Sequence, residues 1–239
     1  MSIRPILESR PAQPTMEGAG VHLHRAFGFQ DPTELDPFLL FDDFRNDDPA
    51  HYRQGFPWHP HRGIETITYV LEGTVEHADS LGNTGRLGAG SVQWMTAGSG
   101  ILHQEMPLGN ARGQMHGFQL WGNLPGSMKM TAPRYQDIQG AEIPEVTDDD
   151  GTHVRVITGA FWGKRGPVDG IAADPQYLDV TVPAGLKKTF GSTPTGAPLP
   201  MCFRGRERSR TPRRPPACCW KRRSWGRRST SATCPGTAR

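Results

Sequence analysis

Short runs of alternating apolar and polar residues, separated by glycine-containing turns, recur along the first 190 residues of the chain. Side chains two residues apart lie on the same face of a β-strand, so this pattern predicts many short strands. The strongest run covers residues 63–77 and breaks at Glu72-Gly73, which indicates a hairpin. We expect further strands over 20–28, 36–45, 91–96, 101–106, 114–123, 153–159, 161–163 and 177–182.

The distribution of these runs divides the chain into three parts. Residues 1–130 contain most of the predicted strands and are expected to form a β-barrel behind an extended arm at 1–19. A connector spans 126–150, and the strands predicted after it assign residues 131–190 to a second, partial barrel without a metal site. From residue 191 on, the pattern has neither strand nor helix periodicity, so we expect 191–239 to be a disordered, basic, Pro- and Arg-rich tail.

Charge and cysteine content change abruptly at the start of this tail. Residues 1–200 contain 15 Lys and Arg against 23 Asp and Glu, whereas residues 201–239 contain 12 against one, together with all four cysteines. An Arg-rich segment of this kind can bind nucleic acid. A GC-rich gene read out of frame gives the same mixture of Arg, Pro, Cys, Trp, Ser and Gly, and the abrupt change favours that reading over nucleic-acid binding.

The sequence gives no sign of a membrane or export segment. It has no run of 18 apolar residues, and its first residues lack the basic start and apolar core of a signal peptide. The first 200 residues contain no cysteine, which a reducing compartment permits. We therefore expect a cytoplasmic protein with no membrane partner.

Two pairs of candidate metal ligands flank the strongest strand signal. His59 and His61 occur in F-P-W-H-P-H-R-G, and His103 and Glu105 occur in G-S-G-I-L-H-Q-E-M about forty residues later. The members of each pair are two residues apart, so each pair can direct two donor groups to one face of its strand. An antiparallel fold of the intervening strands would bring all four donors around one metal ion.

Three imidazoles and one carboxylate form a donor set that suits Fe(II), Mn(II), Ni(II), Cu(II) or Co(II). Structural zinc sites usually contain cysteine, which the body of this chain lacks. Four protein ligands leave two positions of an octahedral metal open for a substrate, O2 or water. Since neutral imidazole is the form that binds metal, affinity is expected to fall below about pH 6.5.

Other polar residues compete with this assignment. Glu65, four residues after His61, is a rival ligand or a partner for a nearby arginine. His22 and His24 form another H-X-H pair, but no second donor pair accompanies them, which favours surface histidines. An apolar wall beside the site has several candidates, most of which core packing explains equally well: Phe56, Trp58, Met95, Met106 and Phe118.

Two further groups of polar residues have alternative explanations. The aspartates at 42, 43, 47 and 48 would suit a hard cation, although turn and cap chemistry explains Asp-rich loops more often. His116 and Gln119 are candidates for orienting the metal ligands, since ligating histidines need hydrogen-bonding partners.

Five segments carry a family resemblance, and they are D-P-F-L-L-F-D-D-F-R (36–45), F-P-W-H-P-H-R-G-I-E-T (56–66), Q-W-M-T-A-G-S-G-I-L-H-Q-E-M (93–106), H-G-F-Q-L-W (116–121) and P-R-Y-Q (133–136). With them the chain resembles the pirin family over roughly residues 1–190. The resemblance implies an all-β bicupin, with two double-stranded β-helix (jelly-roll) barrels, the second incomplete here. It places Fe(II) in the first barrel on His59, His61, His103 and Glu105, and it implies that Glu65 is not a ligand.

The resemblance also implies two alternative functions. Some family members are similar to quercetin 2,3-dioxygenase, an oxidoreductase that would cleave a flavonol-like aromatic substrate with O2, and Glu105 would then act both as ligand and as general base. Others resemble transcriptional co-regulators that bind a protein partner according to the oxidation state of their iron, a role without turnover. The tail after residue 190 departs from the family, in which further strands of the second barrel would follow.

Overall fold

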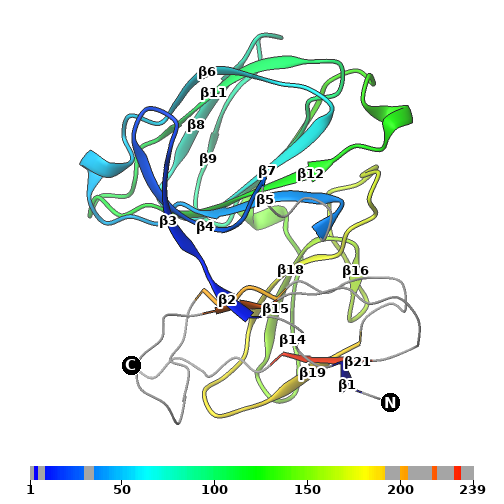
Figure 1. The fold of residues 1–239 in the computed structure, drawn as a ribbon. Helices are drawn as coiled ribbons and strands as arrows, with labels where there is room; N and C mark the ends of the chain where they lie inside the picture. The colour runs from blue at the N-terminus through cyan, green and yellow to red at the C-terminus, as the bar shows by residue number, and fades with distance from the viewer. Residues whose placement is uncertain are drawn as a thin grey trace. The chain divides into compact units, whose positions relative to one another are not determined.

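The computed structural model describes residues 3–4, 9–29, 35–191, 200–203, 217–219 and 229–232. These residues form a predominantly β structure (Figure 1), so the predicted all-β class is confirmed. Three short 3-10 segments are described, η1 Pro49–His51, η2 Gly126–Met128 and η3 Gly140–Glu142. No helix among the described residues is long and apolar enough to cross a membrane.

Two facing antiparallel sheets build the larger of two compact units, which comprises residues 13–144 and 156–178 (Figure 1). The seven-stranded sheet has the order β13-β10-β7-β12-β5-β4-β3, with β3 Gln13–Glu17, β4 Val21–Phe27, β5 Phe38–Asp43, β7 Ile64–Glu72, β10 Val92–Thr96, β12 His116–Asn123 and β13 Arg134–Ile138. The four-stranded sheet has the order β6-β11-β8-β9, with β6 Phe56–His61, β8 Val75–Asp79, β9 Thr84–Leu87 and β11 Ile101–Pro107.

Apolar side chains from both sheets fill the space between them. Val21 and Val70 from the seven-stranded sheet belong to one core cluster with Val75 and Leu87 from the four-stranded sheet, and each is at most 3% exposed. Burial alternates along β8 and β11, as expected for antiparallel strands with one covered face. The covered face of β11 is the one that carries its two candidate metal ligands.

Within these two sheets, three strands lie where the sequence pattern predicted none. β3 falls in the predicted arm at 1–19, β9 in the turn-rich stretch 79–90, and β13 in the predicted connector at 126–150. Each of the three is an edge strand of its sheet. An edge strand has one neighbour and more exposed positions, so its residues are more polar and the alternation that reveals an inner strand is weaker.

The remaining strands form short sheets in the orders β14-β15-β18, β1-β21-β19, β2-β20 and β16-β17. Their bounds are β1 Ile3–Arg4, β2 Ser9–Pro11, β14 Glu145–Thr147, β15 His153–Thr158, β16 Ala160–Phe161, β17 Lys164–Arg165, β18 Tyr177–Thr181, β19 Lys188–Phe190, β20 Ala217–Cys219 and β21 Ser229–Ala232. The second compact unit comprises residues 1–12, 145–155 and 179–239. Most of the tail that we expected to be disordered lies outside the described residues, and the boundaries at 130 and 190 stay predictions.

Candidate metal centre

Two adjacent strands bring the predicted ligand pairs together. β6 and β11 are antiparallel, with His59 opposite His103 and His61 opposite Ile101. Residues that face each other across a strand pair project from the same side of the sheet, so the three histidines share one face. The register shifts between His103 and Glu105, and such bulges often lie beside functional sites because they re-aim a side chain.

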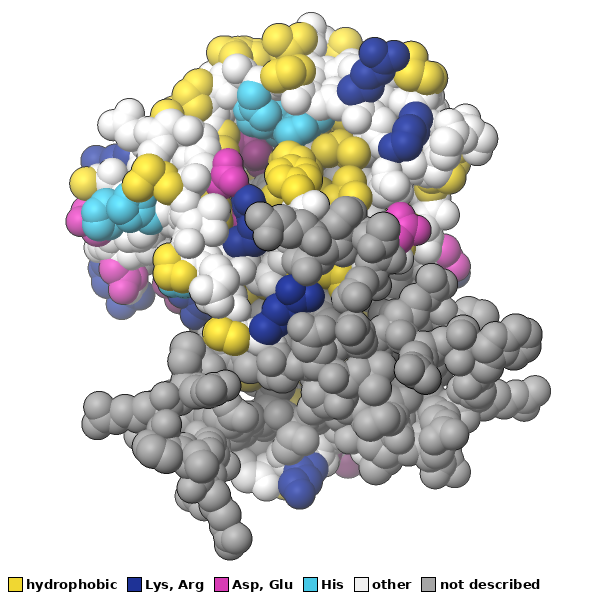
Figure 2. Space-filling model, in the orientation of Figure 1, with side chains coloured by type: hydrophobic (Ala, Val, Ile, Leu, Met, Phe, Trp, Pro, Cys, Tyr) yellow, Lys and Arg dark blue, Asp and Glu magenta, His cyan; other side chains and the backbone are white. Residues whose placement is uncertain are grey.

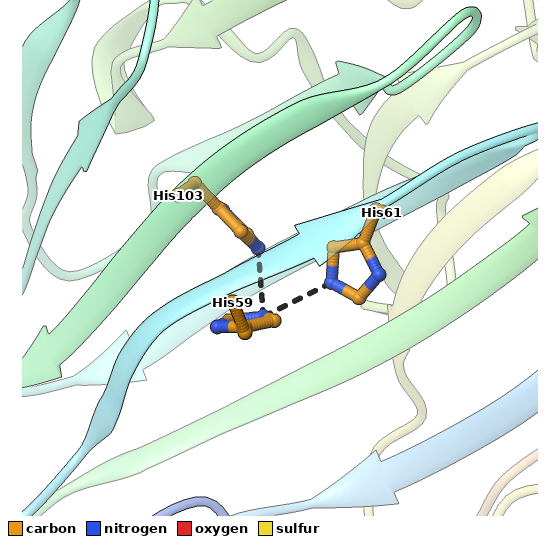
Figure 3. Close-up of side chains that lie close together, drawn as sticks. All are labelled: His59, His61 and His103. Carbon is orange, nitrogen blue, oxygen red and sulfur yellow. Dashed lines mark hydrogen bonds between the residues drawn. The ribbon is translucent and has the colours of Figure 1, made fainter.

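The three imidazoles converge on one point (Figure 3). His59 Nε2 lies 3.0 Å from His61 Nε2 and 3.0 Å from His103 Nε2, and the ligand atoms of all three residues lie within 4.8 Å of one another. Metal–imidazole bonds are about 2.0–2.1 Å long, so two nitrogens bound to one ion lie roughly 3.0–3.4 Å apart. The two distances from His59 Nε2 are therefore compatible with binding of one metal ion by these imidazoles.

The backbone sets the tautomer of His59. Its Nδ1 lies 2.8 Å from the carbonyl oxygen of Pro57. A carbonyl oxygen only accepts hydrogen bonds, so Nδ1 carries the proton and Nε2 presents a lone pair. Ligating histidines commonly donate their other N–H in this way, which fixes the orientation of the ring. His59 is thus prepared to bind a metal through Nε2.

Burial keeps the other two imidazoles neutral. His103 is fully buried, and this burial, followed by the charges of His59 and His77, lowers its pKa to about 3. Burial, followed by the charges of His103 and His59, also lowers the pKa of His61 to about 4, although Glu105 opposes the shift. Protons therefore compete with a metal for these two rings only well below the pH of about 6.5 that holds for an exposed histidine.

Glu105 enters the same interior from β11 but lies outside the three-histidine group. Its side chain is buried, and Oε1 accepts a hydrogen bond of 2.7 Å from Thr68 Oγ1. Thr68 Oγ1 also lies 2.8 Å from the side-chain amide of Gln119. Because a hydroxyl carries one proton, Gln119 presents its NH2 group to Thr68 when Thr68 donates to Glu105. These two hydrogen bonds orient the Glu105 carboxylate. Gln119 therefore has an orienting role, as expected, and the residue that it orients is Glu105.

Glycine turns hold the ends of the ligand strands together. The N–H of Gly63, two residues after His61, donates to the carbonyl of Gly98, three residues before Ile101, at 2.8 Å. Gly98 has a φ of +52°, and a Cβ there would lie 2.1 Å from the carbonyl oxygen of Thr131. Only glycine fits such a position without displacing the neighbouring backbone.

Aromatic side chains border the exposed side of the histidines. The ring centroid of Trp121 lies 4.9 Å from that of His61 in an edge-on arrangement, and Phe29 packs against Trp121 at 5.6 Å. The predicted wall residue Trp58 directly precedes His59 on β6, so it lies on the opposite, exposed face of the strand. Figure 2 shows histidine side chains that reach the surface among hydrophobic ones in the upper part of the molecule, which contains β6 and β11. A planar aromatic molecule could approach the histidines from this side.

Two of the predicted wall residues belong to the core: Met95 is fully buried with Ala97 and Ile101, and Phe118 stacks on Phe41. Phe56 packs against the main core cluster and also lies opposite Glu105 on β6. Trp121 takes the wall position that sequence reasoning did not assign. It lies two residues after Gln119 on β12, so the same period-of-two argument that selected the ligand pairs would have found it.

The rival candidates have other partners. Glu65 Oε1 accepts a 2.8 Å hydrogen bond from Thr96 Oγ1, and burial raises the pKa of this carboxyl group. His22 stacks on His51 with ring centroids 4.2 Å apart, and His24 is exposed on the same face of β4. Within the described ranges, the three-histidine cluster is the one group of three or more such donors that meets metal-binding distances.

The aspartates at 42–48 have partners within the protein, and the expected cap chemistry holds for Asp48, whereas Asp42 and Asp43 lie in β5 and form ion pairs. Asp42 accepts two hydrogen bonds of 2.8 Å from Arg25, Asp43 binds Arg45, and Asp48 caps η1. His116, proposed as an orienting residue for the ligands, lies beside Asp43 with Nε2 3.7 Å from Oδ1.

Two facing β-sheets with three histidines converging from neighbouring strands define a cupin-type protein with a candidate metal centre. The family model described as Pirin matches residues 20–122 of this chain. A pirin-like protein from Caulobacter vibrioides is 50% identical over 186 residues, which cover 77% of this chain and 67% of the relative. The chain belongs to the pirin family.

Solved structures agree with this assignment. A crystal structure of quercetin 2,3-dioxygenase from Acinetobacter baumannii aligns with a TM-score of 0.69 and 33% identity, covering 79% of this chain and 68% of that chain. A crystal structure of GK1651 from Geobacillus kaustophilus aligns with a TM-score of 0.82 and 29% identity, covering 99% and 94%. Since the chain spans about two thirds of the Caulobacter relative, its activity, substrate and partners are matters of proposal.

Proposed function

We propose that this chain is an Fe(II)-dependent dioxygenase of the quercetin 2,3-dioxygenase type, with His59, His61, His103 and Glu105 as its metal ligands. The observation that carries the proposal is the convergence of three imidazoles, with His59 Nε2 3.0 Å from Nε2 of both His61 and His103, in an interior that also holds a buried carboxylate. The fold similarity to a quercetin 2,3-dioxygenase supports it. Mn(II), Ni(II), Co(II) and Cu(II) suit the same donors, and Fe(II) is the metal that we propose.

The bound metal would supply Lewis-acid and redox chemistry toward a chelating flavonol and O2. The chain supplies the remaining functions. Glu105 accepts the proton of the flavonol 3-hydroxyl, while Thr68 and Gln119 hold the accepting carboxylate in place. Trp121 offers an aromatic surface to the rings of the substrate. We propose that this reaction takes place in the cytoplasm. Residues 1–200 contain no cysteine, which is compatible with the reducing conditions there.

The test loads the full chain anaerobically with Fe(II) and then adds quercetin and O2. The expected result is loss of the flavonol absorbance together with O2 uptake and release of carbon monoxide. A Glu105→Gln variant, which keeps the shape of the side chain but loses both the base and the proposed anionic ligand, should lose turnover. Iron-replete protein that consumes neither quercetin nor O2 would defeat the proposal and would leave the regulatory role, to be tested by partner binding in the Fe(II) and Fe(III) states.

A further inference from the structure

A fourth buried histidine lies behind the candidate metal centre. β8 pairs with β11 on the side away from β6, with His77 opposite Glu105 and Asp79 opposite His103. Facing and diagonal residues of such a pair share one face, and ring side chains reach across the diagonal. The side chain of His77 is 1% exposed. His77 is therefore placed diagonally next to His103, inside the same interior.

The seven-stranded sheet holds His77 from the other side. His77 Nε2 lies 3.1 Å from Asp137 Oδ2, and the ring of Tyr135 stacks on His77 with centroids 5.8 Å apart and planes inclined by 12°. Asp137 Oδ1 also accepts a 3.0 Å hydrogen bond from Gln93 Nε2. Burial alone would raise the pKa of Asp137, but the hydrogen bonds from His77 and Gln93 lower it on balance. Asp137 is therefore an anionic acceptor that fixes His77 Nε2 as the protonated nitrogen when this ring is neutral.

The position opposite His77 on β9 is a glycine. A Cβ at Gly85 would lie 2.3 Å from His77 Nε2 and 3.2 Å from Asp137 Oδ2. A larger residue would push the imidazole away from the carboxylate. Gly85 thus makes room for the contact between His77 and Asp137.

Three buried polar atoms of these residues have complementary hydrogen-bonding roles. His103 Nδ1, His77 Nδ1 and Tyr135 Oη are buried and have no hydrogen-bond partner within the part of the chain that the structure describes. To bind a metal through Nε2, His103 must carry its proton on Nδ1, which is then a donor. Neutral His77 donates Nε2–H to Asp137 and presents a lone pair on Nδ1, which is an acceptor. Burial, followed by the charges of Asp79 and Glu105, raises the pKa of Tyr135, so its hydroxyl is a second donor.

We propose that Asp137 and His77 are positioning residues for the metal ligand His103, joined to it by one buried water. The water accepts hydrogen bonds from His103 Nδ1–H and Tyr135 Oη–H and donates one to His77 Nδ1, about the number of bonds that buried waters make. A carboxylate behind a ligating histidine fixes the ring and raises its basicity. This inference rests on the proposed metal centre but not on the dioxygenase activity.

Asp79 is the rival partner because it faces His103 directly. Its carboxylate is already engaged within its own turn, where it accepts hydrogen bonds from the backbone N–H groups of Leu81 and Asn83 and from the side-chain amide of Asn83. His77 Nδ1 has no such competing donor among the described residues. The geometry therefore favours His77 as the acceptor.

The test measures Fe(II) affinity by chelator competition and the Fe(III)/Fe(II) midpoint potential in the full chain. Asp137→Asn and His77→Leu should each weaken Fe(II) binding about 10–100-fold. Both should raise the potential, because a less basic His103 stabilises Fe(III) less. His77→Gln keeps a donor for Asp137 and an acceptor for the water, so it should recover most of both values. Asp169→Asn, a change at a carboxylate whose side chain is 81% exposed, is the matched control and should change neither.

The outcomes separate the possible failures. Weaker affinity with an unchanged potential would reduce His77 to a structural link between the two sheets and overturn the inference, as would unchanged affinity and potential. Wild-type protein that binds no iron would overturn the metal centre as well, whereas iron binding without turnover would defeat only the dioxygenase. If His77→Leu does not fold, the isosteric Asp137→Asn and the His77→Gln variant decide the question.

Discussion

His59 and His103 face each other across β6 and β11, and their Nε2 atoms lie 3.0 Å apart. The Nδ1 proton of His59 is committed to the Pro57 carbonyl, so His59 Nε2 can only accept. Because His59 Nε2 has one lone pair, it cannot accept hydrogen bonds from both of the other imidazoles at once. A cation at the point of convergence removes this conflict, because all three nitrogens can then present lone pairs to it.

Loss of one of these imidazoles should abolish metal binding. Replacing His103 with alanine is expected to weaken metal affinity by more than about 100-fold, since losing a residue that merely supports a ligand already costs 10–100-fold. Metal content after dialysis, measured by elemental analysis, checks this. His24→Ala, at an exposed histidine of the other H-X-H pair, should leave the content unchanged. A His103→Ala protein with full occupancy would argue against the whole centre.

The two buried glutamates should differ in their effect on the metal. Glu105→Gln is expected to lower metal affinity because it removes the proposed anionic ligand, whereas Glu65→Gln should leave affinity unchanged. Glu65 binds Thr96, and burial raises its pKa, so a neutral amide is tolerated there. Isothermal titration of both metal-free variants with Fe(II) under anaerobic conditions separates the two. Equal losses of affinity would return Glu65 to the list of ligands.

The hydroxyl that orients Glu105 should affect turnover more than metal content. Thr68→Val keeps the shape of the side chain but removes the donor to Glu105 Oε1, so we expect turnover to fall about 10–100-fold with iron largely retained. Quercetin consumption per bound iron is the measurement. Thr96→Val removes the equivalent hydroxyl from Glu65 and serves as the control. Similar turnover in both variants would remove Thr68 from the site.

Acid should destabilise the metal-free protein through its histidines. Burial lowers the pKa of His103 to about 3 and that of His61 to about 4, while an unfolded histidine titrates near 6.5. Between these values the unfolded chain binds more protons than the folded one, so this contribution to stability is complete above about pH 6.5 and declines as the pH falls toward 4. The slope is at most about 1.4 kcal/mol per pH unit for each histidine.

Urea unfolding of metal-free protein at several values between pH 7 and pH 4.5 measures this slope. The His103→Ala variant provides the comparison, because it lacks one of the two shifted groups and should show a shallower dependence. A wild-type free energy of unfolding that stays constant over this range would show that the imidazoles are not buried in the neutral form.

Much of the fold could be predicted because the inner strands alternate clearly. β7 and β8 came from one run with a glycine break, and β11 from a run in which His103 and Glu105 share a face. The edge strands β3, β9 and β13 were missed, since their more exposed residues lack a clear apolar face. A pattern read along one strand also carries no information on which strands become neighbours.

The same limit applies to the site. The two ligand pairs could be predicted because both members of each pair lie on one strand, two residues apart. Thr68 and Trp121 reach the ligands from the facing sheet, and Asp137 reaches His77 from a strand sixty residues later. Their roles depend on strand order and register, which local alternation does not fix. The residues that surround a ligand were therefore harder to predict than the ligand itself.

The turn before β11 offers a test of how the ligand strands are held. Gly98→Ala places a methyl group where Thr131 carbonyl oxygen lies 2.1 Å away, at a φ of +52°. Gly82→Ala has a similar backbone cost, with φ +89°, but its methyl group meets nothing within 4 Å. The left-handed conformation costs an alanine roughly 1–2 kcal/mol. Gly82→Ala should therefore lower the free energy of unfolding by about that amount, and Gly98→Ala should lower it by clearly more. Urea unfolding gives both values, and only Gly98→Ala should also weaken metal binding, because the turn sets the end of the strand that carries His103. Equal destabilisation by both variants would show that the contact with Thr131 has no part in positioning β11.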